Sequence, residues 1–341
     1  MAIDLSTTYL GLRLSNPLIA SSSPLTGNLD SLRRLEDAGA AAVVLPSLFE
    51  EQLPAVMARS EVSSVKPSDN ATNNASAAGY RPDSDNDPAG PDAYLQLIHR
   101  AKSSLRIPVI ASLNGFSLGR WLDFSGQLQQ AGADAVELNV YLVPTDSHLS
   151  SQDIELHYLS LLQQVVQSTH IPIALKLSPH FSALPNFARQ LVANGARGLV
   201  LFNRFLEPDI DTQQRTYHPQ LLLSYRHELR SVLRWIAILR DQIPCSLGAT
   251  GGIHQGEDVL KAILAGADAT LLASILLRNG PDHLLALSQE LVIWMEEHER
   301  SSLRQLKGMM SYGNCPDPSV VARHSYTAAL QSFIDWRNWL T

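Results

Sequence analysis

LGATGGIHQGEDVLKAILAGADATLLASILL, residues Leu247–Leu277, reads as a strand, a glycine turn, a helix, and a second strand that ends at Ala273-Ser274. Gly251 and Gly252 follow the first strand, where glycine lets a ligand approach the backbone and the helix start behind it favours negative charge. In a (β/α)8 barrel, the loops after the seventh and eighth strands commonly form a phosphate site. We therefore expect Gly251, Gly252, Ala273 and Ser274 to bind a phosphate group.

Two short signals alternate along the rest of the chain, and each precedes an apolar strand. Gly-Ala pairs precede four strands, Ile-Pro pairs precede three, and the segment around Leu18–Ala20 supplies an eighth. Apolar strands separated by amphipathic helices are typical of a parallel sheet buried on both faces. A doubly wound open sheet has the same elements, but eight evenly spaced units favour a (β/α)8 TIM barrel. The expected strands include Leu18–Ala20, Ala42–Leu45, Val109–Leu113, Ala135–Asn139, Ile173–Leu177, Leu199–Phe202 and Ala269–Leu272.

We expect one domain over residues 1–341, because barrels of this length fold as a unit. Residues Ile3–Leu14 predict an N-terminal hairpin that plugs the bottom of the barrel. The polar segment Glu51–Pro91 follows the second strand, and we expect a partly disordered lid over the active site. Phe205–His218 is expected to be a long loop.

Residues 281–341 predict a C-terminal helical extension. A helix over His283–Arg300 opens it, a break follows at Gly308, and the tail carries Trp336 and Trp339. We expect that tail to pack on the barrel or on a second subunit.

Composition excludes several classes of function. The net charge of −7 argues against binding to nucleic acid and to anionic membrane surfaces. No apolar run is long enough to span a membrane, and no signal peptide is evident. The two cysteines, Cys245 and Cys315, form no metal-binding pattern, so we expect no metal site and a cytoplasmic location.

Lys176 lies inside an otherwise apolar strand, where a charge is costly unless it meets an anion. Its neighbours Leu175 and Leu177 are expected to point toward the helices, so Lys176 should point into the barrel mouth. Asn114, Asn139 and Asn203 also stand at strand ends, although Asn114 fits equally well as a turn residue before Gly115. A cation and amides around a phosphate site suit the ring of a flavin, which predicts FMN as the cofactor.

These motifs resemble class 1 dihydroorotate dehydrogenases. The resemblance rests on NPLIASSSP from Asn16, ELN at Glu137–Asn139, ALKLSP at Ala174–Pro179, LFNR at Leu201–Arg204, and ATGGI followed by AGADATLLAS. It implies an FMN barrel that oxidises dihydroorotate to orotate in pyrimidine biosynthesis, with a base in the loop after the fourth strand. It also implies a homodimer and flavin contacts at Ala20, Ser21, Asn139, Lys176 and Asn203.

Three departures separate this chain from that family. The family's N-L-S-C/S-P-N after the fourth strand is replaced by Asn139-Val140-Tyr141-Leu142-Val143-Pro144-Thr145, which lacks a Cys or Ser base. The family's lysine after the second strand is missing around Leu45-Pro46-Ser47. Its substrate-binding asparagine motif is not evident in Glu51–Pro91. Tyr141 or Thr145 would then be the replacement base.

Alternatives therefore stay open. The chain could act on another small acid, or it could be a non-catalytic flavin-binding partner protein. An electron-transfer partner is a further expectation. An aldolase that forms a Schiff base on Lys176 fits less well, because no His and carboxylate cluster accompanies the lysine. The expected effect of Lys176→Ala is weaker electron affinity of the flavin, and that of Gly252→Asp is a clash with the phosphate.

Overall fold

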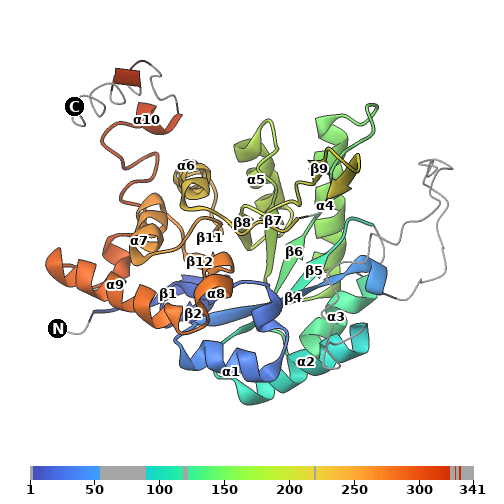
Figure 1. Ribbon diagram of the computed structural model, residues 1–341, viewed down its shortest axis with the longest axis horizontal. Coiled ribbons are helices and arrows are strands. Elements are labelled where there is room, and N and C mark those ends of the chain that lie inside the picture. Colours follow the sequence, from blue (N-terminus) through green and yellow to red (C-terminus); the bar gives the residue numbers. More distant parts are fainter. Residues whose placement is uncertain are drawn as a thin grey trace.

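The computed structural model describes residues 3–53, 90–117, 122–218 and 220–322, together with residues 327, 330 and 331. Eight parallel strands close into a barrel with helices around it, as expected (Figure 1). The barrel strands are β3 (Leu18–Ala20), β4 (Ala42–Phe49), β5 (Val109–Asn114), β6 (Ala135–Asn139), β7 (Ile173–Leu177), β8 (Gly198–Leu201), β11 (Ser246–Thr250) and β12 (Ala269–Leu272).

The helices follow the strands in the order that a TIM barrel requires. They are α1 (Leu29–Asp37), α2 (Pro91–Ser104), α3 (Leu122–Gln130), α4 (Ser151–Ser168), α5 (Leu184–Ala193), α6 (Leu229–Arg240), α7 (Gly256–Ala265), α8 (Ser274–Asn279), α9 (His283–Glu297) and α10 (Ser319–Ala322). The short helices are η1 (Pro24–Thr26), η2 (Glu50–Gln52), η3 (Arg226–Glu228) and η4 (Leu303–Gln305).

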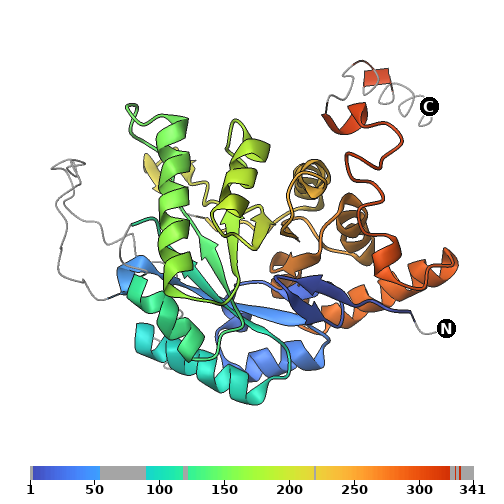
Figure 2. The same cartoon turned by 180° about the vertical axis from the view of Figure 1, so that it is seen from behind.

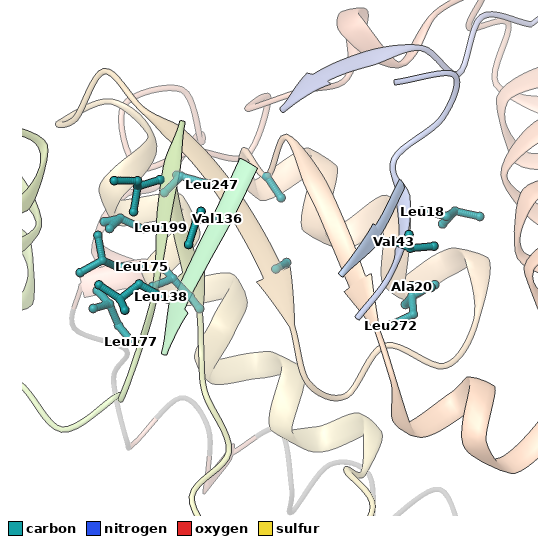
Figure 3. Close-up of a cluster of buried hydrophobic side chains, with 14 of the residues drawn as sticks. Leu18, Ala20, Val43, Val136, Leu138, Leu175, Leu177, Leu199, Leu247 and Leu272 are labelled. Atoms are coloured by element: carbon teal, nitrogen blue, oxygen red, sulfur yellow. The ribbon is translucent and has the colours of Figure 1, made fainter. Parts of the chain in front are cut away.

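The strands bury both of their faces. One face packs against the helices in a large apolar layer, and Figure 3 shows Leu175, Leu177 and Leu199 side by side within it. The other face forms a smaller cluster inside the barrel, including Ile110 and Val200. Because side chains alternate along a strand, Lys176 between Leu175 and Leu177 belongs to the inner face, as expected.

A hairpin of β1 (Thr7–Tyr9) and β2 (Leu12–Leu14) closes the end of the barrel where the strands begin (Figure 2). Tyr9 and Leu10 are buried in the inner cluster. The backbone N–H of Leu10 donates to Ser246 Oγ over 2.9 Å at the start of β11. Gly198 has no room for a Cβ atom because the Leu10 side chain fills that space. The prediction of a bottom plug is confirmed.

The second strand is longer than predicted. It was expected to end at Leu45, but β4 continues to Phe49. Its pairing with β5 shifts register between Val44 and Ser47. Pro46 lies in this irregular section, where the N–H that proline lacks is not needed by the ladder. The shift places Ser47 opposite Ser112 in the barrel mouth.

The predicted loop over Phe205–His218 is wrong in part. The segment contains a hairpin of β9 (Asp209–Asp211) and β10 (Thr216–His218). Its turn residue Arg215 has φ +54°, a conformation more often adopted by glycine or asparagine.

The helix predicted over His283–Arg300 ends at Glu297. After it, the backbone N–H groups of Gly308, Met310 and Tyr312 donate to carbonyls of α7 and α6, so this part of the extension packs on the barrel. The predicted lid over Glu51–Pro91 falls largely on residues 54–89, and Trp336 and Trp339 belong to the tail. Both lie outside the described residues.

Candidate active site

A cleft of about 760 Å³ opens at the carboxyl ends of the strands. Loops after β3, β7, β8, β11 and β12 form its walls. Seven of the residues expected to bind cofactor line it: Ser21, Lys176, Asn203, Gly251, Gly252, Ala273 and Ser274. Because active sites of TIM barrels lie at this end, the cleft is the candidate active site.

The two glycines after β11 play different structural roles. Both have positive φ, +91° at Gly251 and +74° at Gly252. A Cβ atom at Gly251 would meet nothing within 4 Å, so this residue opens onto free space. A Cβ atom at Gly252 would lie 2.5 Å from Leu229 N and 2.8 Å from Tyr225 O. Gly251 therefore offers a ligand close approach to the backbone, while Gly252 permits the loop before α6 to pack down.

Ser224 connects the loops after β11 and β12. Its Oγ accepts the Gly252 N–H over 3.2 Å. Its own N–H donates to Ser274 Oγ over 3.0 Å. The sequence did not point to Ser224, since the residue lies in an irregular segment before α6. Its two hydrogen bonds fix the spacing between the glycine turn and the start of α8.

Asp258, in the first turn of α7, holds the shape of the glycine loop. Its Oδ2 accepts backbone N–H groups of His254 and Gln255 over 3.0 and 3.1 Å. The Arg226 guanidinium donates to both carboxylate oxygens over 2.8 and 3.0 Å. Burial alone would raise the pKa of Asp258, but Arg226 and the two N–H groups outweigh burial and lower it below 3.8.

His254 is half-buried in the same loop. Burial lowers the pKa of His254, and the nearby Arg278 lowers it further. Its Nε2 atom is buried with no hydrogen-bond partner in the described part of the chain. The imidazole of His254 therefore lies two residues after Gly252, in the loop that Asp258 holds.

A buried ion pair occupies the barrel mouth. Lys176 Nζ lies 3.3 Å from Glu137 Oε1, with 11% of the lysine and 1% of the glutamate side chain exposed. Both side chains belong to inner-face positions of neighbouring strands, β7 and β6. Glu137 lies within the ELN motif of β6, but its sequence context predicted no role for it. An acidic residue on the inner face of an apolar strand was the signal for it.

Beside the ion pair, three polar side chains form a small network. Ser47 Oγ and Ser112 Oγ lie 2.8 Å apart. Asn139 Nδ2 donates to Ser112 Oγ over 2.9 Å and to Ser47 Oγ over 3.2 Å. Asn139 Oδ1 is buried with no partner among the described residues. A buried acceptor without a partner is expensive, so this oxygen suits a ligand that donates an N–H.

Two other residues predicted to contact the cofactor, Asn114 and Ala20, are not among the residues that line the cleft. Asn114 ends β5 on the same face as Ser112, next to Asn139 in the ladder, and is half-buried. The Ala20 side chain packs in the outer apolar layer between strands and helices.

The comparison with family models matches residues 86–295 to the dihydroorotate dehydrogenase model. This match spans more than half of the chain. The chain belongs to the dihydroorotate dehydrogenase family. Members of this family are flavin oxidoreductases.

Similar curated proteins agree with this family. The catalytic subunit of dihydroorotate dehydrogenase B (NAD(+)) from Thermoplasma acidophilum is 26% identical over 316 residues, covering 90% of this chain and 98% of that protein. Its counterpart from Methanocaldococcus jannaschii is 23% identical, covering 89% and 97%. Chloroplastic dihydropyrimidine dehydrogenase (NADP(+)) of Arabidopsis thaliana is 20% identical, covering 89% and 76%.

The two residues expected to replace the family's base lie at the edge of the cleft or beyond it. The Tyr141 ring packs on Phe205 with centroids 4.3 Å apart, and its hydroxyl accepts the Leu206 N–H over 3.1 Å. Thr145 is exposed and does not line the cleft. His180 and His227 do line it, and the sequence analysis overlooked both. The Ser-Pro-His run directly after β7 was the available signal for His180.

Two absences hold for the described residues 3–53, 90–117, 122–218 and 220–322. No group of three or more His, Cys, Asp or Glu side chains is placed to hold a metal ion in these ranges. None of the described helices combines the length and apolar character needed to cross a bilayer.

Proposed function

We propose that this protein is an FMN-dependent oxidoreductase that converts dihydroorotate to orotate. One observation carries the proposal: the buried cation Lys176 lines the same cleft as the open glycine turn at Gly251. A proposed phosphate cradle and a buried cation in one cleft suit the phosphate and the ring of FMN.

The residues present fit this cofactor. Gly251, Gly252, Ala273 and Ser274 would hold the phosphate, since Gly251 leaves open space where a side chain would otherwise stand. Ser21, Asn139, Lys176 and Asn203 would hold the ring, with the half-buried Asn114 beside them. The partnerless Asn139 Oδ1 suits a ring N–H.

FMN supplies the hydride acceptor for oxidation of a carbon–carbon bond. The protein's own residues perform the remaining tasks. The Lys176 ammonium, held by Glu137, favours negative charge at the inner end of the cleft. The amides of Asn139 and Asn203 orient a flat, polar ring. A base in the cleft takes a proton from the carbon next to the one that loses hydride.

The base is assigned to one of three residues. Tyr141 and Thr145 are the candidates from the loop after β6, and His180 is added because it lines the cleft. Histidine is the side chain used most often as a general base. Tyr141→Phe, Thr145→Val and His180→Gln should separate them, because only loss of the true base slows reduction of bound flavin by about 10²–10⁴-fold.

One observation favours a second substrate, a 5,6-dihydropyrimidine without a carboxylate. Two cations among the described lining residues are already paired, Lys176 with Glu137 and Arg204 with Glu228. A substrate carboxylate would have to compete for them. The resemblance to a plant dihydropyrimidine dehydrogenase is consistent with an uncharged ring.

The deciding experiment is an anaerobic visible spectrum of the purified protein. Bleaching of a flavin band by dihydroorotate supports the first substrate, and bleaching by dihydrouracil alone supports the second. A flavin band that neither compound bleaches contradicts both substrates. A protein that neither contains nor binds FMN contradicts the cofactor itself.

We also propose a homodimer and an electron-transfer partner. The exposed apolar side chains of the β9–β10 hairpin support self-association, with Ile210 57% and Tyr217 72% exposed. Relatives are named as catalytic subunits, which supports a second, electron-accepting protein. Light scattering should give twice the chain mass, and Tyr217→Asp should halve it if this hairpin forms the contact.

A further inference from the structure

A second set of cavities lies at the opposite end of the barrel from the candidate active site. One, of about 950 Å³, is lined by residues at the starts of β7, β8, β11 and β12 and by the plug hairpin. The other, of about 620 Å³, lies between that hairpin and the segment after α9. The two cavities share the lining residues Thr8, Arg240 and Lys307, so they adjoin one another.

Positive charge is concentrated in this region. The cationic lining residues are Arg13, Arg197, Arg240, Arg304 and Lys307, while the carboxylates lining it are Asp4 and Asp268. Cations therefore exceed carboxylates by three in a chain whose net charge is −7. Such a local reversal of sign attracts anions and raises their local concentration.

Internal ion pairs compensate only part of this positive charge. Asp268 accepts from Arg240 Nη1 over 3.2 Å and from Lys307 Nζ over 2.9 Å, and its Oδ2 also accepts the Leu247 N–H. The single negative charge of Asp268 thus balances only one of the two positive charges on Arg240 and Lys307. In the described ranges, Arg197 and Arg304 form no salt bridge.

Two of the five cations, Arg240 and Lys307, are held in place, while Arg13, Arg197 and Arg304 are exposed. Asp268 is 5% exposed and anchors the Arg240 and Lys307 side chains. Arg240 comes from α6 and Lys307 from the segment after η4, so the pair joins two separate elements. Burial raises the pKa of the nearby Cys245 thiol to about 12, so this residue adds no negative charge.

We propose that this end of the barrel binds a small polyanion carrying two or more phosphoryl groups. Arginine guanidinium groups match phosphate oxygens in geometry and charge. Cations distributed over two adjoining cavities suit a ligand with separated anionic groups better than a single ion. Each of the two cavities, at about 950 and 620 Å³, has the size of an ordinary small-molecule site. This site is separate from the phosphate cradle at Gly251.

Titration calorimetry with inorganic pyrophosphate tests the proposal, using protein saturated with FMN so that the cradle is occupied. The expected result is one saturable site with a Kd below about 1 mM that weakens as salt is added. Orthophosphate should bind more weakly. Citrate, which carries carboxylates instead of phosphoryl groups, is the comparison ligand. Citrate binding as tight as that of pyrophosphate would overturn the choice of phosphoryl groups.

Variants locate the site. The double substitution R197Q/R304Q should weaken pyrophosphate binding by about tenfold or more, because it removes two unpaired cations without touching the Asp268 anchor. The matched control R230Q/R234Q removes two exposed arginines of α6 that do not line these cavities, and should change Kd less than about twofold. Equal losses in both variants, or no saturable binding, would overturn the proposal.

A repeat without added FMN separates this site from the active site. If a second equivalent of pyrophosphate binds only when FMN is absent, that equivalent occupies the cradle. If all binding disappears on FMN saturation, the anion site at the barrel bottom does not exist. The proposed oxidoreductase function is unaffected by that outcome, because it depends on flavin bleaching alone.

Discussion

Lys176 Nζ and Glu137 Oε1 lie 3.3 Å apart across neighbouring strands in the mouth of the barrel. Neither charge reaches bulk water easily, so each depends on the other. Removal of one partner from a buried pair leaves an uncompensated charge, whereas replacement of both by apolar residues is often tolerated. The pair therefore couples the stability of the barrel to the chemistry of the cleft.

The first prediction is that Glu137→Gln lowers the free energy of unfolding by about 3–5 kcal/mol. Urea unfolding measures this loss. The double variant Glu137→Leu with Lys176→Leu should recover much of the stability, while it loses the cation that the flavin ring needs. A Glu137→Gln protein as stable as the wild type would show that the pair is not buried as described.

The second prediction concerns pH. The pKa of Asp258 is lowered, so its stabilising effect is present above 3.8 and is lost as the pH falls through the lower folded value. Asp258→Asn should be less stable than wild type at pH 7, and the difference should shrink below pH 3.8. Urea midpoints between pH 7 and pH 3 measure it. Glu257→Gln is the matched control, since this exposed partner of Arg226 should matter little.

The third prediction revises the role of Gly252. A Cβ atom there meets the chain's own backbone at Leu229 and Tyr225 rather than a phosphate. Gly252→Ala should therefore lower the melting temperature by adding a clash of about 1–3 kcal/mol to the strain of positive φ.

Gly251 supplies the comparison for that test. Gly251→Ala carries only the strain of about 1–2 kcal/mol, because its Cβ atom would enter open space. It should weaken FMN binding more than it weakens the fold. If both variants lose stability equally and bind FMN equally well, the cradle assignment fails.

The fourth prediction compares two serines around Asn139. Ser112→Ala removes the fully buried hydroxyl at 2.9 Å from Asn139 Nδ2, and should cost about 1–3 kcal/mol in unfolding free energy. Ser47→Ala removes the longer contact at 3.2 Å and should cost less, since Asn139 keeps Ser112. The reverse order in urea unfolding would contradict the network.

Most of the barrel was predictable because its signals are local. The direction of Lys176 followed from the apolar residues on either side of it, and the structure confirms that direction. Glu137 as its partner did not follow, because the two residues are 39 positions apart and meet only through the register between β6 and β7. Register depends on barrel closure, which no local pattern encodes.

Two other differences also have physical reasons. Ser47 reaches the barrel mouth only because β4 continues past Pro46 through a register shift, and proline normally predicts the end of a strand. The β9–β10 hairpin was missed because Arg215 occupies the turn position with positive φ, so the usual Asn-Gly signal is absent. Ser224 carries no sequence signal, since its role comes from contacts with distant loops.

The closing seam of the barrel has a consequence for biosynthesis. β3 pairs with β12 through Leu18 with Thr270 and Ile19 with Leu271. The first barrel strand therefore cannot complete its pairing until the last strand has been synthesised. While the ribosome makes the residues between them, one edge of β3 stays unpaired. Unpaired apolar edges recruit other chains. We expect the nascent polypeptide to need chaperone protection until Leu272 has left the exit tunnel, and slower translation before that point to increase aggregation.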